Sequence, residues 1–396
     1  MTSFSNEQSY DFGTRSLHGD RDMESGTSVA PSLHQSVTHF ATSGEDFAFK
    51  ASEPLNDQFY ARHGNPTASR LARILADLEG GEAAMIMSSG MGSIATTVLA
   101  LVSAGEHVIA QTNHYIGTTN LLTQVLPRFG VEVTQVDQRD SEAFRRAIQP
   151  NSRLIIVETP VNPTMQLTDL AAVAAIARES AILTLCDNTV ATPFLQRPLE
   201  LGIDVCLHSA TKYIGGHHDL LAGAVVTSRS LIERIWDMSM TLGPIPAPFN
   251  AWLALRGIRT LKLRMQQHCA SATAIAEYLA THPKIEKVNY PGLPDHPQHE
   301  LAQRQMTAFG GLLSYEVAGG YEGARRFIEA LRIPLNAGSL GGVDSLVIQP
   351  AAMWGGRLPD EVVKSQGVGP GLIRMAVGIE DIADLLFDLT QALDHV

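Results

Sequence analysis

Cysteine is scarce in this 396-residue sequence, which contains only Cys186, Cys206 and Cys269. An odd, sparse set without CxxC spacing argues against a disulfide framework and against a zinc site, and we expect no metal. Cys186 and Cys206 fall in predicted buried strands, where a thiol behaves as a small apolar side chain. This usage indicates a reducing compartment, and we expect the protein to be cytoplasmic.

Long apolar runs and basic clusters are missing too. No stretch is long and apolar enough to span a bilayer, and the N-terminus lacks the basic and apolar regions of a signal peptide. The formal net charge is -12, and no run rich in Lys and Arg occurs. These absences argue against a membrane location and against nucleic acid or anionic membranes as partners.

What is present is an ordinary globular composition, 44% hydrophobic and 18% charged, in a chain long enough for two domains. Short apolar strands alternate with helical segments between about residues 82 and 227. This alternation predicts an α/β fold with a mostly parallel, doubly wound sheet, and such sheets bind ligands beyond the carboxyl ends of their strands.

The composition and periodicity of the sequence change on either side of that region. The first 50 or so residues are polar and show little periodicity, so we expect an extended arm without a core of its own. Residues 247–280 predict one long helix, and the mixed helices and strands after it predict a smaller domain. The expected parts are an N-terminal arm (1–60), a large domain (61–246) and a C-terminal smaller α/β domain (247–396).

Lys212 follows one of the buried strands, in the stretch HSATKYIGG, with Ser209 and Thr211 near it. A lysine at a buried strand end is costly to desolvate unless it is used. Two hydroxyls beside it suit a phosphate, while the amine reaches an aldehyde; this is the layout of a pyridoxal phosphate (PLP) site. A surface lysine in a polar turn fits the same letters, and this motif alone does not decide between them.

Further candidates follow other strands. The run Ser88-Ser89-Gly90-Met91 joins a strand to a helix, and such a turn can bind an anion, although its glycines also suit plain close packing. Asp187 ends a buried strand, where it pairs with a protonated pyridine nitrogen or caps a loop.

Three more side chains are candidates for contacts with a cofactor or substrate. Tyr115 after a strand end suits ring stacking and proton transfer, or an ordinary place at the core edge. Asn162, in a turn bracketed by prolines, can aim its amide at a ring hydroxyl. Arg374, alone in an apolar strand, suits a substrate carboxylate or an internal salt bridge.

Taken together and in order, these motifs resemble the Cys/Met-metabolism (trans-sulfuration) family of PLP-dependent enzymes, which includes methionine γ-lyase, cystathionine γ-lyase and cystathionine γ-synthase. The resemblance runs from about Ser32 to the C-terminus and rests on YARHGNPT, SSGM, ETPVNPT, DNTVATP, SATKYIGGH, LRGIRTL, SLGGVDSL and LIRMAVGIE. It implies the aspartate-aminotransferase fold (fold type I) and a homotetramer, a dimer of dimers, with shared active sites.

The resemblance also implies a role for each matching residue. Lys212 would carry PLP and act as base, and Tyr115 would stack on the ring, contact the substrate and protonate the leaving group. Asp187 would pair with the ring nitrogen and Thr189 would pack on the other ring face. The remaining expected contacts are with the phosphate (Ser89, Gly90, Met91, Ser209, Thr211), with the neighbouring subunit's phosphate (Tyr60, Arg62), and with the substrate carboxylate (Ser339, Arg374).

The implied reaction is γ-elimination on an L-amino acid with a leaving group at C4, giving a 2-oxo acid and ammonia or an unsaturated product. γ-Replacement on an O-acylhomoserine and a β-lyase reaction are the alternatives, and the intact site residues argue against a PLP-fold protein kept only for binding.

Methionine γ-lyases carry a cysteine shortly after the stacking tyrosine, and Ile116-Gly117-Thr118 has none. They also carry Lys-Asp where this chain has Ser239-Met240, and Gln349 replaces a frequent histidine. These departures indicate an unusual γ-substituent.

Overall fold

The computed structural model describes residues 10–24, 26–354 and 367–396. Its larger sheet has seven strands in the order β1-β7-β6-β5-β4-β2-β3. Strands β2 to β6 are parallel, whereas β7 runs antiparallel to both of its neighbours. The strands are β1 (Ala83–Met87), β2 (His107–Gln111), β3 (Glu132–Val136), β4 (Ser152–Glu158), β5 (Leu183–Asp187), β6 (Val205–His208) and β7 (Gly223–Thr227).

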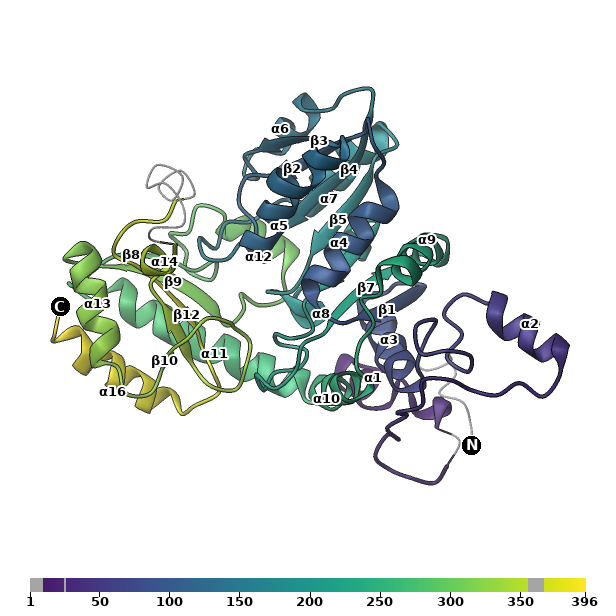
Figure 1. Ribbon diagram of the computed structural model, residues 1–396. Helices are drawn as coiled ribbons and strands as arrows, with labels where there is room; N and C mark the ends of the chain where they lie inside the picture. The colour runs from purple at the N-terminus through teal and green to yellow at the C-terminus, as the bar shows by residue number, and fades with distance from the viewer. Residues whose placement is uncertain (1–9, 25, 355–366) are drawn as a thin grey trace.

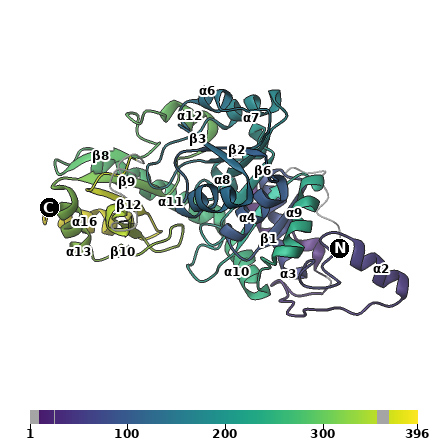
Figure 2. The same ribbon diagram turned by 45° about the horizontal axis from the view of Figure 1, so that its top comes forward.

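Helices cover both faces of this sheet because alternate strand residues point to opposite sides. On one face, Val108 and Ala110 belong to a core that includes α4 (Gly90–Leu101) and α9 (Arg229–Leu242). On the other, Ile109 packs with α6 (Ser141–Arg146) and α7 (Leu170–Glu179), and α3 (Pro66–Glu79) covers the β1 side. Helices α4 and α9 lie side by side in both ribbon views (Figures 1 and 2). The predicted doubly wound fold is therefore confirmed.

The C-terminal part has its own five-stranded sheet in the order β10-β11-β12-β9-β8, drawn in green to yellow in Figure 1. Its strands are β8 (Ile285–Asn289), β9 (Leu312–Val317), β10 (Leu335–Asn336), β11 (Leu346–Ile348) and β12 (Leu372–Ala376). Helices α11 (Leu261–Ala280), α13 (Gly320–Ala330) and α16 (Ile382–Leu393) pack on it through a separate apolar core. The shorter helices near these sheets are α5 (Ile116–Asn120), α8 (Thr192–Leu195), α12 (His299–Gln305) and α14 (Pro350–Trp354).

The expected single helix over 247–280 is wrong, because it is two helices, α10 (Pro248–Ile258) and α11, separated by Arg259 and Thr260. At the break, the Gly257 carbonyl accepts hydrogen bonds from Arg264 Nη2 (2.8 Å) and from the Thr260 backbone N–H (3.1 Å). These donors occupy the Gly257 carbonyl, which a continuous helix would use for its own backbone hydrogen bond. None of the described helices is long and apolar enough to cross a membrane.

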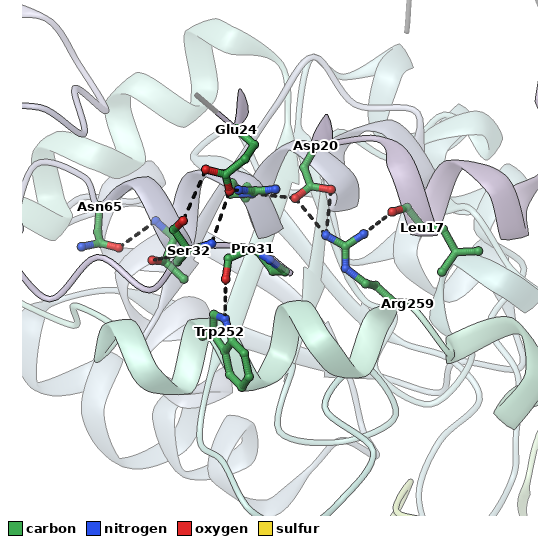
Figure 3. Close-up of polar contacts among 10 residues, drawn as sticks. Leu17, Asp20, Glu24, Pro31, Ser32, Asn65, Trp252 and Arg259 are labelled. Atoms are coloured by element: carbon green, nitrogen blue, oxygen red, sulfur yellow. Dashed lines mark hydrogen bonds and ion pairs between the residues drawn. The ribbon is translucent and has the colours of Figure 1, made fainter. Parts of the chain in front are cut away.

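The N-terminal segment also differs from the expected extended arm without a core. Helix α1 (Phe12–His18) packs Phe12 against the large core, and a 3-10 turn follows at Arg21–Met23. The fully buried Asp20 accepts from Arg259 Nη2 (3.0 Å), as Figure 3 shows, and from Arg70 Nε (2.6 Å). Arg70 also pairs with Glu24. Helix α2 (Gly44–Ser52), with no buried residue, projects away from the molecule (Figure 1).

Candidate active site

A cavity of about 480 Å³ lies at the carboxyl edge of the larger sheet, where that edge meets the C-terminal part. Strands β1, β2, β4, β5 and β6 all end at this edge, so their following loops converge on it. Every predicted site residue except Tyr60 and Arg62 lines the cavity, namely Ser89, Gly90, Met91, Tyr115, Asn162, Asp187, Thr189, Ser209, Thr211, Lys212, Ser339 and Arg374.

The Lys212 amine lies in the cavity and donates a hydrogen bond to Ser339 Oγ (2.9 Å). Burial lowers the pKa of Lys212, and the nearby Arg374 guanidinium lowers it further. The amine therefore loses its proton more easily than an ordinary lysine, as a nucleophile or base requires. Ser339 has a φ of 120°, an unfavourable conformation for a residue with a side chain, and such strain is typical of functional sites.

Arg374, on the central strand β12, is almost fully buried at 2% exposure. Its Nη1 donates to the Ser339 carbonyl (2.5 Å), whereas its Nε has no hydrogen-bond partner among the described residues. Burial lowers the pKa of Arg374 to about 10, so the guanidinium stays charged at neutral pH. No acidic side chain of the described chain forms an ion pair with it, and this leaves its charge for an anionic ligand.

Two carboxyl groups lie next to one another at the strand ends. Asp187 and Glu158 are register partners on β5 and β4. Burial raises the pKa of both; the Asp187 charge adds to this effect at Glu158, whose pKa reaches about 8. Asp187 Oδ1 accepts from the Thr189 backbone N–H (3.0 Å), and the neighbouring His208 lowers the pKa of Asp187 in part. A cation placed in the cavity would relieve this crowding of negative charge.

The amino end of α4 forms another wall. Ser89 caps the helix by accepting from the Gly92 N–H (2.9 Å), which leaves the first N–H groups of the helix pointing at the cavity. A Cβ on Gly90 would lie 2.8 Å from Ser209 Cβ, so only glycine permits this approach to the loop after β6. The Thr211 hydroxyl is bonded to the Ala222 backbone at 3.1 and 3.2 Å, and the Ser209 N–H donates to Thr189 Oγ1 (2.7 Å).

Tyr115 and Asn162 face the cavity from two loops. Tyr115 is 48% exposed, and Asn162 Oδ1 is buried without a partner among the described residues. The backbone N–H groups of both residues bind the Glu158 carboxyl, at 2.7 and 3.4 Å. Glu158, the first residue of the ETPVNPT motif, has no predicted role, because its bonds reach backbone atoms that no sequence pattern marks.

Tyr60 and Arg62 lie elsewhere. Arg62 lines a different cavity of about 250 Å³, donates to the Met240 carbonyl (3.0 Å), and its guanidinium carbon is 5.4 Å from the Tyr60 ring centre. The structure of one chain thus separates these two residues from the other candidates.

A buried polar cluster outside the cavity lining was not expected from the sequence. Donor atoms of Glu79, Cys206 and His208 all lie within 4.8 Å of one another, and among the described residues this is the one group of three such side chains close enough to share a metal ion. His208 Nε2 and Glu79 Oε1 are 2.6 Å apart, and Asn188 Nδ2 donates to the same oxygen (2.9 Å). These contacts are those of a hydrogen-bonded pair.

The donor set fits PLP. The α4 amino end and Ser209 suit a phosphate, and the Asp187 carboxyl suits a ring cation. Asn162 has a side-chain amide whose Oδ1 is unpartnered, and the nitrogen of that amide suits a ring oxygen. The Lys212 amine suits an aldehyde, and the uncommitted charge of Arg374 suits a carboxylate.

Comparisons with known proteins agree with this geometry. The family described as "Cys/Met metabolism PLP-dependent enzyme" matches residues 13–394. An L-methionine γ-lyase from Pseudomonas deceptionensis is 43% identical over 98% of each chain, and a cystathionine β-lyase from Lactococcus lactis is 44% identical over 85% of this chain and 88% of that one. The crystal structure of cystathionine γ-lyase from Lactobacillus plantarum complexed with L-serine superposes with a TM-score of 0.92, at 38% identity, covering 98% of this chain and 99% of that one.

Proposed function

Because the chain belongs to the Cys/Met metabolism family of PLP-dependent enzymes, we propose that it is a γ-lyase acting on an L-amino acid with a leaving group at C4. The observation that carries this proposal is the convergence of Lys212, Tyr115, Asp187 and Arg374 on one cavity. Similarity to methionine γ-lyases over nearly the whole chain supports γ-elimination in particular. With one water consumed, the products would be a 2-oxo acid, ammonia and the released γ-substituent.

Each residue would have a separate task. PLP, when bound, supplies the electron sink that stabilises negative charge at the substrate Cα. Asp187 would keep the ring nitrogen protonated, and the α4 amino end with Ser209 would hold the phosphate. Arg374 would bind the substrate carboxylate beside Ser339. Lys212, on a flexible stem, would take the proton from Cα and then move one at Cβ, and Tyr115 would protonate the departing group.

γ-Replacement on an O-acylhomoserine is a second candidate, and a β-lyase reaction is a third, which the similarity to the Lactococcus lactis cystathionine β-lyase favours. The positions at which this chain departs from methionine γ-lyases bear on the identity of the γ-substituent. Ile116 and Thr118 line the cavity, whereas Gln349 donates its amide to the Tyr321 (3.0 Å) and Pro370 (2.9 Å) carbonyls and does not line it. Among these positions, Ile116 and Thr118 are therefore placed to contact a γ-substituent.

Isotope exchange tests the γ assignment. In heavy water, a γ-elimination should place deuterium at both Cα and Cβ of recovered substrate, because the chain must move protons at both atoms. A panel of methionine, homocysteine, cystathionine, canavanine and O-acylhomoserines supplies the substrates. Exchange at Cα alone, with pyruvate as the sole oxo acid from every substrate, would replace the proposal with a β-lyase.

We also propose that the protein is a cytoplasmic homotetramer built from two dimers with shared sites. Three unpaired buried thiols support a reducing compartment. Large apolar side chains of the N-terminal segment, such as Phe40 (85% exposed) and Phe47 (56%), support a partner surface there. We place the domain boundaries near residues 60 and 246, and the two separate sheets support the second of them. Residues 1–9 and 25 of the arm and residues 355–366 of the C-terminal part lie outside the described part of the chain.

A further inference from the structure

Glu158 is a buried carboxyl group at the floor of the cavity, with 5% exposure. Burying such a group is costly unless hydrogen bonds satisfy it. Among the described residues, no Lys, Arg or His side chain lies in ion-pair contact with it, and its bonds go to backbone N–H groups. Its neighbour Asp187 adds a second negative charge beside it. These unfavourable surroundings indicate that the Glu158 carboxyl has a role other than stabilising the fold.

The two oxygens of Glu158 hold two different loops. Oε2 accepts from the Tyr115 N–H (2.7 Å), in the loop after β2, and Oε1 accepts from the Asn162 N–H (3.4 Å), in the loop after β4. The Glu158 backbone is itself fixed to β2, because its N–H donates to Gln111 Oε1 (3.0 Å) and its carbonyl accepts from Gln111 Nε2 (2.9 Å). One rigid strand end thus fixes the start of both loops.

One side of the Tyr115 ring lies against its own loop. A Cβ on Gly117 would lie 2.7 Å from Tyr115 Cε1 and 2.5 Å from Met91 Sδ, so the ring packs closely against the Gly117 backbone and the α4 wall. A displacement of the Tyr115 backbone would therefore carry the ring with it. The bond to Glu158 fixes that backbone at the residue itself.

We propose that Glu158 is a positioning residue, which sets the Tyr115 ring and the Asn162 amide against a bound cofactor. It acts through these two residues and does not itself transfer a proton. This inference rests on the proposed function, together with the contacts expected for a bound cofactor: the Tyr115 ring stacked on the cofactor ring and the Asn162 amide on a ring oxygen. It adds Glu158 as the one residue that holds the loops of both Tyr115 and Asn162.

The test compares Glu158→Gln with Asp388→Asn in the PLP-loaded enzyme. Asp388 is a matched control: it is 2% exposed, lies outside the cavity, and likewise accepts from two backbone N–H groups, those of Arg332 (3.0 Å) and Ile333 (2.8 Å). Both substitutions replace one carboxylate oxygen by an amide nitrogen. We expect similar losses of thermal stability, but only Glu158→Gln should change the visible circular dichroism of the bound cofactor, which reports ring orientation.

Kinetic measurements, and the same substitution in a variant that lacks both positioned side chains, complete the experiment. Glu158→Gln should lower kcat about tenfold or more with KM within about threefold, because positioning acts on the reacting geometry. In a Tyr115→Ala, Asn162→Ala background, the same substitution should have no further effect on the dichroism. If Glu158→Gln does not fold, Glu158→Asp, too short to hold both loops, takes its place.

Equal behaviour of Glu158→Gln and Asp388→Asn would overturn the proposal, as would a full effect in the doubly substituted background. The dichroism needs no substrate. A wild-type enzyme that binds PLP but does not eliminate would therefore disprove the proposed function and leave this comparison intact.

Discussion

At the scale of single residues, the environment of Lys212 explains why this lysine can do chemistry that others cannot. Its amine is held by Ser339, in a region that also contains the Arg374 charge. Burial disfavours the ammonium form, and a nearby positive charge disfavours it again. Both effects increase the fraction of neutral amine near pH 7.

The sign of this effect gives a pH prediction. In the cofactor-free protein, the labelling rate of Lys212 by an amine-reactive reagent should rise with pH and reach its midpoint below the ordinary lysine value of about 10.4. Arg374→Gln removes the second cause of the lowered pKa, so the midpoint should move to higher pH. Peptide mass spectrometry quantifies the label. Arg256→Gln, at an exposed site outside the cavity, should leave the midpoint unchanged; an unmoved midpoint in Arg374→Gln would contradict the assignment.

The sequence alone was informative about which residues gather, because parallel strands bring their carboxyl ends to one edge. This rule places Gly90, Asp187 and Lys212 in one cavity without any structure. It does not predict the Lys212–Ser339 hydrogen bond, which joins residues 127 positions apart in loops that follow strands of two different sheets. It also does not predict the role of Glu158, whose partners are backbone atoms.

At the scale of elements, the amino end of α4 tests whether a close approach matters for the cofactor. Gly90→Ala places a Cβ 2.8 Å from Ser209 Cβ and must displace the loop that leads to Lys212. We expect PLP affinity to fall about tenfold or more, equivalent to about 1.4 kcal/mol, when apoenzyme is titrated with PLP by visible absorbance.

Gly44→Ala is the matched control, because Gly44 also begins a helix and a Cβ there meets nothing within 4 Å. It should bind PLP within about twofold of the parent, since no close contact is made. Wild-type affinity in Gly90→Ala would show that the α4 wall tolerates the shift and does not shape the site.

Helix ends show what periodicity misses. The sequence pattern runs through Arg259, yet the structure ends α10 there, because Arg259 turns to Asp20 and Leu17 and Arg264 binds the Gly257 carbonyl. Helix α1 was missed for the same reason: its attachment depends on Asp20, whose partners are 50 and 239 positions away. Local patterns carry no information about such distant pairs.

This attachment predicts a difference between two neighbouring aspartates. Asp20→Asn leaves the buried Arg70 with Glu24 as its remaining acidic partner and takes the acidic partner from the partly buried Arg259, so it should destabilise the fold by about 3 kcal/mol. Asp22→Asn breaks only an exposed pair with Arg73 (3.2 Å) and should cost less than about 1 kcal/mol. Urea denaturation followed by far-ultraviolet circular dichroism measures both. Equal costs would mean that the cluster in Figure 3 does not anchor the N-terminal segment.

At the scale of the whole molecule, the cavity exists because two sheets meet. The larger sheet supplies the amine and the carboxyls, and β12 of the smaller sheet supplies Arg374, so substrate and cofactor contacts come from different parts of the chain. Tyr60 and Arg62 are absent from this cavity although the family resemblance gives them a phosphate contact. A neighbouring subunit is the one arrangement that reconciles these two facts within the proposed dimer.

Subunit mixing tests that arrangement. Lys212→Ala and Arg62→Ala enzymes should each be inactive, and a mixed dimer contains one site with both native residues. Random exchange makes about half of the dimers mixed, so activity should recover to about one quarter of the parental value. Mixing Lys212→Ala with a Lys212→Ala, Arg62→Ala double variant provides the control, because no intact site can form. No recovery, despite exchange demonstrated by mass-labelled chains, would mean that each site is built from a single chain and that Arg62 serves its own subunit through the Met240 carbonyl alone.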